Sequence, residues 1–253
     1  MGKDRPGAGA ESGIRTLEPG RAGLTDPAAR QDIAVKPPPD RLYGRSRGHK
    51  LRPRQERLLD VTLPRLEYRT NEALPSSLWL EVGFGGGEHA IAQVRSHPEA
   101  TLIACEVFEN GICSLLSALV PEGEEATAAL PPNLRVWTDD ARLLLRALPD
   151  ACLDRLFLLF PDPWPKTRHA KRRFVHPAML PLLARVLRQG GEWRVASDDP
   201  TYQAWVREVM AAQTLFRVAE PATTRPLTWP PTRYEAKALR AGRQPLYWSL
   251  IRV

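Results

Sequence analysis

From about residue 50 onward, short apolar runs alternate with segments whose apolar residues recur at helical spacing. The runs are typical of buried strands, and the recurrences are typical of amphipathic helices. We expect strands over 77–82, 101–107, 134–137, 153–160 and 192–196, and helices over 53–68, 87–95, 110–119, 140–148, 176–188 and 201–213. This alternation predicts an α/β fold built on a doubly wound, mostly parallel sheet with crossover helices.

The same pattern suggests where several elements end. Pro64 lies inside the first predicted helix and is expected to interrupt it. Gly190 and Gly191 are expected to close the helix over 176–188. Residues 221–242 are interpreted as a loop, and 245–253 as a last strand that could pair antiparallel with the rest of the sheet.

The first forty residues differ in composition from the rest. They hold six Gly, six Pro, no aromatic residue and equal numbers of acidic and basic residues. Such a segment cannot bury enough apolar surface to offset the entropy lost on ordering. We therefore predict a disordered tail over 1–40 and a single domain over 41–253.

Charge and cysteine content narrow the classes of protein. The chain carries a formal net charge of +7, which permits polyanionic partners. Two segments are strongly basic: 41–57 with seven Lys or Arg, and 161–175 with five. No apolar stretch is long enough to cross a membrane, no secretory signal is visible, and three Cys exclude a disulfide scaffold. We expect a cytoplasmic protein whose cysteines are buried filler.

A glycine-rich loop follows the first predicted strand. It reads Glu81-Val82-Gly83-Phe84-Gly85-Gly86-Gly87, and such glycines let a ligand approach the backbone closely. The dinucleotide fingerprint would place its third glycine at position 88, where this chain has a glutamate. A carboxylate there would repel a pyrophosphate, so NAD and FAD are disfavoured. Glu81 could instead meet an ammonium group.

Further acids stand at the ends of the next two strands. Glu106 lies 21 residues beyond Gly85, where an acid can accept ribose hydroxyls. Asp139 and Asp140 follow the third strand, where a carboxylate can accept from an adenine amino group. Any one of these acids could be a helix N-cap. Together with the glycine loop, they predict a site for S-adenosylmethionine (SAM).

The loop after the fourth strand is the most informative segment. It reads Phe160-Pro161-Asp162-Pro163-Trp164-Pro165-Lys166, at the edge of a parallel sheet where ligands bind. Prolines on both sides restrict the backbone of Asp162, and Trp164 offers a flat face to a base. The cations that follow, through Arg173, match a phosphate-bearing substrate. A Pro-rich connector with a solvated basic tail is the alternative interpretation.

These motifs resemble those of the bacterial tRNA (guanine-N7-)-methyltransferases. The resemblance covers roughly residues 41–253 and rests on LEVGFGGGEH, PDPWPKTRHAKRRFV and the late TRYE. The Gly-Glu-His end of the glycine loop and the basic segment RLYGRSRGHKLRPRQ are similar to the alphaproteobacterial branch. The resemblance implies a Rossmann-like class I SAM-dependent methyltransferase fold, SAM as cofactor, and tRNA as partner, with position 46 of the variable loop as the family's usual target.

The resemblance also implies roles for individual residues. Asp162 resembles the catalytic residue, and the cofactor residues correspond to Glu81, Gly83, Gly85, Glu106 and Asp140. Substrate-side residues correspond to Lys166, Asp198, Thr232, Arg233, Tyr234 and Glu235. From its position alone, Asp198 could equally be an N-cap. Extra residues in the segment 226–231 depart from the family's pattern and affect the local loop geometry.

The implied chemistry needs no proton acceptor, because guanine N7 carries a lone pair and no hydrogen. Catalysis would then rest on in-line placement of donor and acceptor, with Asp162 stabilising the charge that develops on the base. The histidines at 49, 89, 97 and 176 lack metal-ligand spacing, so we expect surface or helix-cap positions and no metal.

Two other functions stay open at this point. One is a SAM enzyme that acts on an RNA base amine or on a basic small molecule. The other is an RNA-binding protein with a vestigial donor site. The sequence leaves monomer or homodimer undecided.

Overall fold

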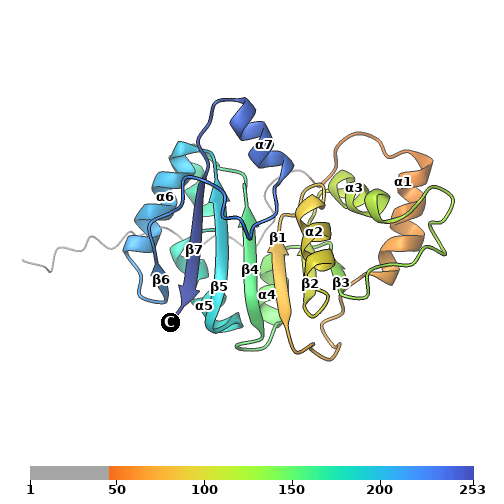
Figure 1. Cartoon of the computed structure of the whole chain (residues 1–253), viewed down its shortest axis with the longest axis horizontal. Helices are drawn as coiled ribbons and strands as arrows, with labels where there is room; N and C mark the ends of the chain where they lie inside the picture. Colours follow the sequence, from red (N-terminus) through yellow and green to blue (C-terminus); the bar gives the residue numbers. More distant parts are fainter. Residues whose placement is uncertain (1–45) are drawn as a thin grey trace, which may run out of the picture. The chain divides into compact units, whose positions relative to one another are not determined.

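The computed structural model describes residues 46–253, so the predicted tail over 1–40 lies outside the described residues. One seven-stranded sheet has the order β3-β2-β1-β4-β5-β7-β6 (Figure 1). Its strands are β1 (Leu78–Val82), β2 (Thr101–Cys105), β3 (Leu134–Trp137), β4 (Leu153–Leu159), β5 (Leu187–Ser197), β6 (Phe216–Val218) and β7 (Leu246–Arg252). The first five run parallel, and β7 is antiparallel to both neighbours. The predicted mostly parallel sheet with an antiparallel last strand is confirmed.

Helices cover both faces of this sheet. They are α1 (Pro53–Arg57), α2 (Glu88–Ser96), α3 (Glu109–Leu119), α4 (Ala141–Ala147), α5 (Leu180–Val186), α6 (Pro200–Ala211) and α7 (Arg233–Arg240). Leu156 and Leu158 of β4 pack with α4, α5 and α6, whereas Phe157 between them packs with α2 and α3. Because strand side chains alternate between faces, one strand serves both apolar layers. The doubly wound arrangement is confirmed.

Three predicted elements differ from the structure. The expected helix over 53–68 is α-helical only as far as Arg57. A π turn over Leu58–Thr62 and a 3-10 turn over Leu63–Arg65 follow it, because Pro64 lacks the amide that an α-helix would need. Gly190 and Gly191 do not close a helix: β5 already begins at Leu187, which pairs with Leu153 before the register shifts. The expected loop over 221–242 contains α7.

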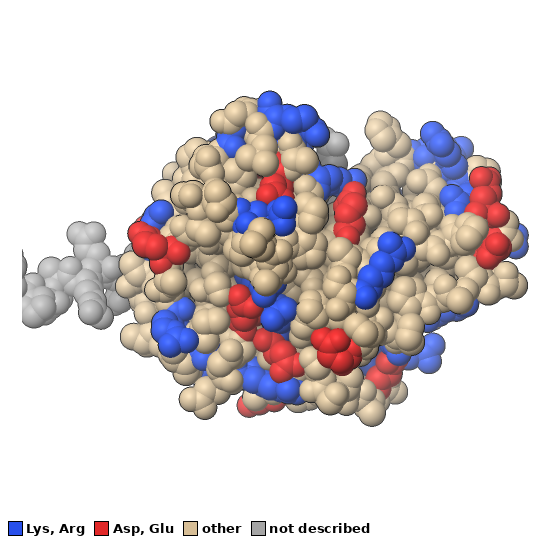
Figure 2. All heavy atoms as spheres, in the orientation of Figure 1, with Lys and Arg blue, Asp and Glu red and all other residues tan. Residues whose placement is uncertain are grey.

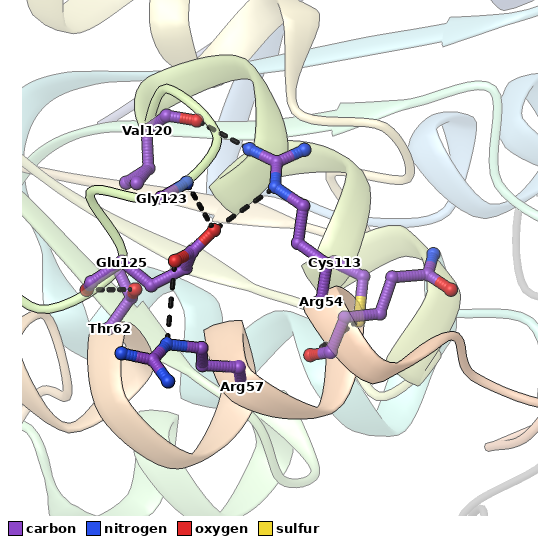
Figure 3. Close-up of polar contacts among 8 residues, drawn as sticks. Arg54, Arg57, Thr62, Cys113, Val120, Gly123 and Glu125 are labelled. Carbon is purple, nitrogen blue, oxygen red and sulfur yellow. Dashed lines mark hydrogen bonds and ion pairs between the residues drawn. The ribbon is translucent and has the colours of Figure 1, made fainter.

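A buried carboxylate attaches the N-terminal segment to the rest of the fold (Figure 3). Glu125, in the loop after α3, pairs with Arg54 Nε at 3.2 Å and Arg57 Nε at 3.4 Å. Hydrogen bonds from its own amide and from Gly123, with Arg54 beside it, hold the pKa of Glu125 below its ordinary value. Thr62 Oγ1 also donates to the Glu125 carbonyl at 2.6 Å. These contacts fix α1 and the turn that follows it against the loop after α3.

Candidate functional site

A pocket lies at the carboxyl ends of β1, β2 and β3, the edge at which parallel sheets bind ligands. Its lining combines the glycine loop, the strand-end acids and the basic segment after β4: Val82, Gly83, Cys105, Glu106, Val107, Asp139, Asp140, Ala141, Arg142, Arg172, Arg173, Phe174 and Met179. We call it the first pocket. It brings together Gly83, Glu106 and Asp140, three of the five predicted cofactor residues.

Two glycines of the loop have different surroundings. Gly83 has a φ of +76°, and a Cβ added to it would have no neighbour within 4 Å, so its backbone faces open space. Gly85 has a φ of +60°, and a Cβ added to it would lie 2.9 Å from Cε2 of Tyr234. The first glycine therefore leaves room for a ligand, and the second admits a side chain from α7.

Glu106 ties the glycine loop to the end of β2. Its carboxylate accepts hydrogen bonds from the amides of Gly85 and Val107, each at 2.8 Å, and of Phe108 at 3.1 Å. Burial raises the pKa of Glu106 above its ordinary value, against these hydrogen bonds. The carboxylate has about four acceptor sites, so three amides leave one site for a ligand hydroxyl.

Asp140 begins α4 as well as lining the first pocket. Its carboxylate accepts from the amide of Arg142 at 2.9 Å and from the same residue's Nε at 2.9 Å. The N-cap interpretation is thus confirmed for Asp140. Cys105 is buried in the same wall, and burial raises its thiol pKa, so the reactive thiolate is disfavoured.

Glu81 lies beneath the glycine loop and is not among the residues that line the first pocket. It is 3 % exposed, and its Oε2 lies 3.0 Å from Nδ1 of His89. The expected surface or cap position is therefore wrong for His89, which is also 3 % exposed. His176 is a cap as predicted, but a buried one, whose Nδ1 accepts from the amide of Ala178.

A second pocket lies at the ends of β4 and β5. It is lined by Phe160, Pro161, Asp162, Pro163, Asp198, Asp199, Tyr234, Lys237 and Arg243. It brings together Asp162, Asp198 and Tyr234 from three separate segments. Phe160 and Trp164 have φ angles of +53° and +45°, which non-glycine residues rarely adopt, so the loop between them is sharply bent. The exposed Asp162 stands within this bend.

The basic segment after this loop has two kinds of cation. Arg173 is buried and donates to the carbonyls of Pro163 at 3.1 Å and Trp164 at 3.0 Å. Lys166, Arg168 and Lys171 are exposed. The expectation that the whole run forms a phosphate-binding cluster is therefore wrong for Arg173, which holds the bent loop. Lys166 stands just before the 3-10 turn over 167–172, outside the second pocket's lining.

The guanidinium of Arg172 lies 4.7 Å from the ring centre of Trp164. The tryptophan face that was expected to receive a base is thus stacked on a cation in this structure. The segment 160–174 borders both pockets, because Arg172 and Arg173 line the first and Asp162 lines the second.

The run Thr232–Glu235 begins α7 above the glycine loop (Figure 1). Thr232 caps the helix by accepting from the amide of Glu235 at 3.0 Å. Glu235 is buried, where its carboxylate accepts from Tyr247 Oη at 2.9 Å and Arg225 Nε at 3.0 Å. Thr232 and Glu235 therefore hold the helix in place.

The other two residues of the run face the glycine loop. Arg233 Nε lies 3.7 Å from the carboxylate of Glu88, which begins α2. Tyr234 lies against Gly85 and also lines the second pocket. Tyr234 thus stands between the glycine loop and Asp162.

Asp198 forms an ion pair with Arg243 Nε at 3.0 Å. The N-cap of α6 is its neighbour Asp199, which accepts from the amide of Tyr202 at 3.0 Å. The alternative interpretation of Asp198 as that cap is therefore wrong. Arg243 was not expected in the site, since nothing in its local sequence distinguishes it from other surface arginines.

Surface charge is mixed on the face drawn in Figure 2. Lys and Arg side chains are interspersed there with Asp and Glu. A group of Lys and Arg side chains lies at the top of this view, over α7. Within residues 46–253, no cluster of three or more His, Cys, Asp or Glu is arranged to hold a metal ion. In the same range no helix is long and apolar enough to cross a membrane.

The chain is similar to known methyltransferases. A family model described as "Putative methyltransferase" matches residues 75–247. A tRNA (guanine-N(7)-)-methyltransferase of Granulibacter bethesdensis is 68% identical over 224 residues, covering 87% of this chain and 99% of the relative. The tRNA (guanine-N(7)-)-methyltransferase of Rhodospirillum rubrum is 48% identical, and the match covers 84% of this chain and 88% of that relative. Among solved structures, an antibiotic-related methyltransferase is 11% identical with a TM-score of 0.48, covering 82% of this chain and 98% of that one.

Proposed function

Because the chain belongs to the tRNA (guanine-N7-)-methyltransferase family, we propose that it transfers a methyl group from SAM to N7 of a guanine in tRNA. One observation carries the proposal beyond the family match. The segment 160–174 borders two pockets, one with the strand-end acids and one with Asp162, Asp198 and Tyr234. A methyl donor in one pocket and a guanine in the other would then share that segment as a wall.

The first pocket fits SAM. Gly83 faces open space, and the pocket wall offers carboxylates at the places where a ribose and an adenine amino group need acceptors. Glu106 would accept from a ribose hydroxyl with its remaining site, and Asp140 would lie at the adenine. Glu81 would face the methionine ammonium from below the loop, with Gly83 and Gly85 allowing the close approach. Bound SAM supplies an electrophilic methyl group.

The second pocket would hold the guanine. Within residues 46–253, the Asp162 carboxylate has no hydrogen-bond or ion-pair partner, so it is available to a ligand. It would accept from guanine N1–H and the 2-amino group, and would stabilise the positive charge that develops as N7 is alkylated. No residue needs to remove a proton, so placement by the bent loop is the main contribution.

The remaining substrate-side residues divide by position. Tyr234 and Asp198 line the second pocket and would contact the guanosine directly. The exposed Lys166 would contact a phosphate beside it, and Arg233 would act at the rim over the glycine loop. Thr232 and Glu235 would act by holding α7.

Within tRNA, we propose guanine 46 of the variable loop as the target and the cytoplasm as the location, because the family acts there. The test is methyl transfer from labelled SAM to bulk tRNA, followed by digestion and nucleoside analysis. We expect 7-methylguanosine, lost when position 46 is changed in a transcript. A methylated exocyclic amine would support the alternative SAM enzyme. Absence of SAM binding in calorimetry would support the RNA-binding protein.

A further inference from the structure

A buried chain of three polar side chains runs beneath the glycine loop. His89 Nδ1 lies 3.0 Å from Glu81 Oε2, and His89 Nε2 lies 3.0 Å from Gln93 Nε2. All three side chains belong to residues that are at most 3 % exposed. Burying three polar side chains costs free energy unless they hydrogen-bond to one another, so this arrangement indicates a functional role.

The strand next to Glu81 places an aromatic ring beside it, and the arginine on the following strand already has a carboxylate partner. Glu81 pairs in register with Phe157, whose ring meets that of His89 at 4.9 Å between centres. Phe157 pairs in turn with Arg194, but that guanidinium is bound to Glu192 at 2.9 Å. Within residues 46–253, no Lys or Arg forms an ion pair with Glu81.

The amide of Gln93 decides which nitrogen of His89 carries the proton. The side-chain nitrogen of Gln93 can only donate, so His89 Nε2 accepts from it. Nδ1 then carries the proton that is donated to Glu81 Oε2. Oε1 of Glu81 makes no hydrogen bond within residues 46–253.

We propose that His89 is a positioning residue for the cofactor. It fixes one oxygen of Glu81, so that the other is directed to the ammonium group of the methionine part of SAM. Gln93 faces Nε2 of the ring and so keeps Nδ1 as the nitrogen that donates to Glu81. This inference rests on the proposed function in one respect, since it takes SAM as the ligand.

Two substitutions at position 89 separate this role from packing. In His89→Asn, the side-chain amide reaches about where Nδ1 lies and can still donate to Glu81. In His89→Gln, the amide reaches about where Nε2 lies and meets Gln93 instead. Two ligands report the effect: S-adenosylhomocysteine, which carries the ammonium, and 5′-methylthioadenosine, which lacks the amino-acid part.

Calorimetry with both ligands gives the expected pattern. His89→Gln should raise the dissociation constant of S-adenosylhomocysteine by about ten- to a hundred-fold, which is the range of one charge-assisted hydrogen bond. The dissociation constant of methylthioadenosine should change by no more than about threefold. His89→Asn should bind both ligands nearly as the unmodified protein does. Glu81→Gln, with His89 intact, should show the same selective loss and serves if His89→Gln does not fold.

Two results would overturn the proposal: equal losses for both ligands in both variants, which is what a packing role gives, or no loss for S-adenosylhomocysteine in His89→Gln. Neither measurement uses tRNA. Failure of the proposed function would instead show as absent 7-methylguanosine in the nucleoside analysis, with the ligand selectivity unaffected.

Discussion

Glu106 joins two tasks in one carboxylate, because it holds the amide of Gly85 and faces the first pocket. Glu106→Ala should weaken SAM binding by about 1–3 kcal/mol, since a charged acceptor is lost to the ligand. The loss is measured as a change in the SAM dissociation constant by calorimetry. An unchanged constant would remove Glu106 from the cofactor site.

The raised pKa of Glu106 adds a pH dependence to the same prediction. The free carboxyl takes up a proton at a less acidic pH than an ordinary glutamate does, and the protonated group is a poorer acceptor. SAM affinity should therefore be full above the raised pKa and fall as the pH drops through it. Glu106→Gln, which cannot titrate, is the control and should abolish this dependence.

Asp162 should act on turnover rather than on cofactor binding. Asp162→Asn keeps the shape of the side chain but removes the charge that we propose stabilises the alkylated guanine. We expect a fall in kcat of roughly a hundred-fold or more with the SAM dissociation constant unchanged. Asp60→Asn, at an exposed aspartate that lines neither of these two pockets, is the matched control. Near-unchanged turnover in Asp162→Asn would contradict the assigned role.

The sequence predicts site residues correctly where they lie directly after the carboxyl end of a predicted strand. Gly83, Glu106 and Asp140 meet in one pocket because parallel strands bring their carboxyl ends to one edge. His89 was misjudged because a histidine at a helix start is equally compatible with solvent. Its spacing of four residues from Gln93 places both on one helix face and was an available signal. Arg173 could not be distinguished from the cations beside it.

The basic segment after the bent loop contains exposed cations that could bind tRNA and a buried arginine that holds the loop. Lys171→Ala should lower the slope of log affinity for tRNA against log salt by about 0.7–0.9, because an exposed cation releases a counterion on binding. Arg173→Ala should instead lower the stability by roughly 1–3 kcal/mol, because two carbonyls lose their donor. Salt titrations and thermal unfolding of both variants distinguish the roles. Equal salt slopes in Lys171→Ala and the unmodified chain would mean that Lys171 only solvates the surface.

Elements with weak local signals were the ones that the sequence did not predict correctly. The first turn of α7 follows a Pro-rich stretch, and only Glu235 and Ala238 within the helix are buried, so it lacks an apolar face. Its position depends instead on distant partners, Arg225 and Tyr247. The start of β5 was missed because Leu187 pairs with Leu153 before two glycines, a long-range contact that no local pattern reveals.

At the scale of the whole molecule, the parallel strands, the antiparallel last strand and the two helical layers followed from hydrophobic periodicity, whereas β6 was not predicted. Composition also predicts that residues 1–40 are dispensable. They lie outside the described residues, contain no aromatic residue and have no net charge. A chain beginning at Asp40 should keep its melting temperature and its methyl transfer to tRNA. Loss of transfer with the melting temperature preserved would make the tail part of the substrate site.

The most direct test of the central claim replaces the atom that is methylated. A tRNA transcribed with 7-deazaguanosine carries C–H in place of N7, and otherwise keeps the hydrogen-bonding edge that Asp162 would contact. Single-turnover transfer of labelled methyl from SAM is measured on this transcript and on the ordinary one. We predict that the ordinary transcript accepts the methyl group and that the 7-deaza transcript binds but accepts none. Equal methylation of both transcripts would contradict N7 as the acceptor and, with it, the proposed function.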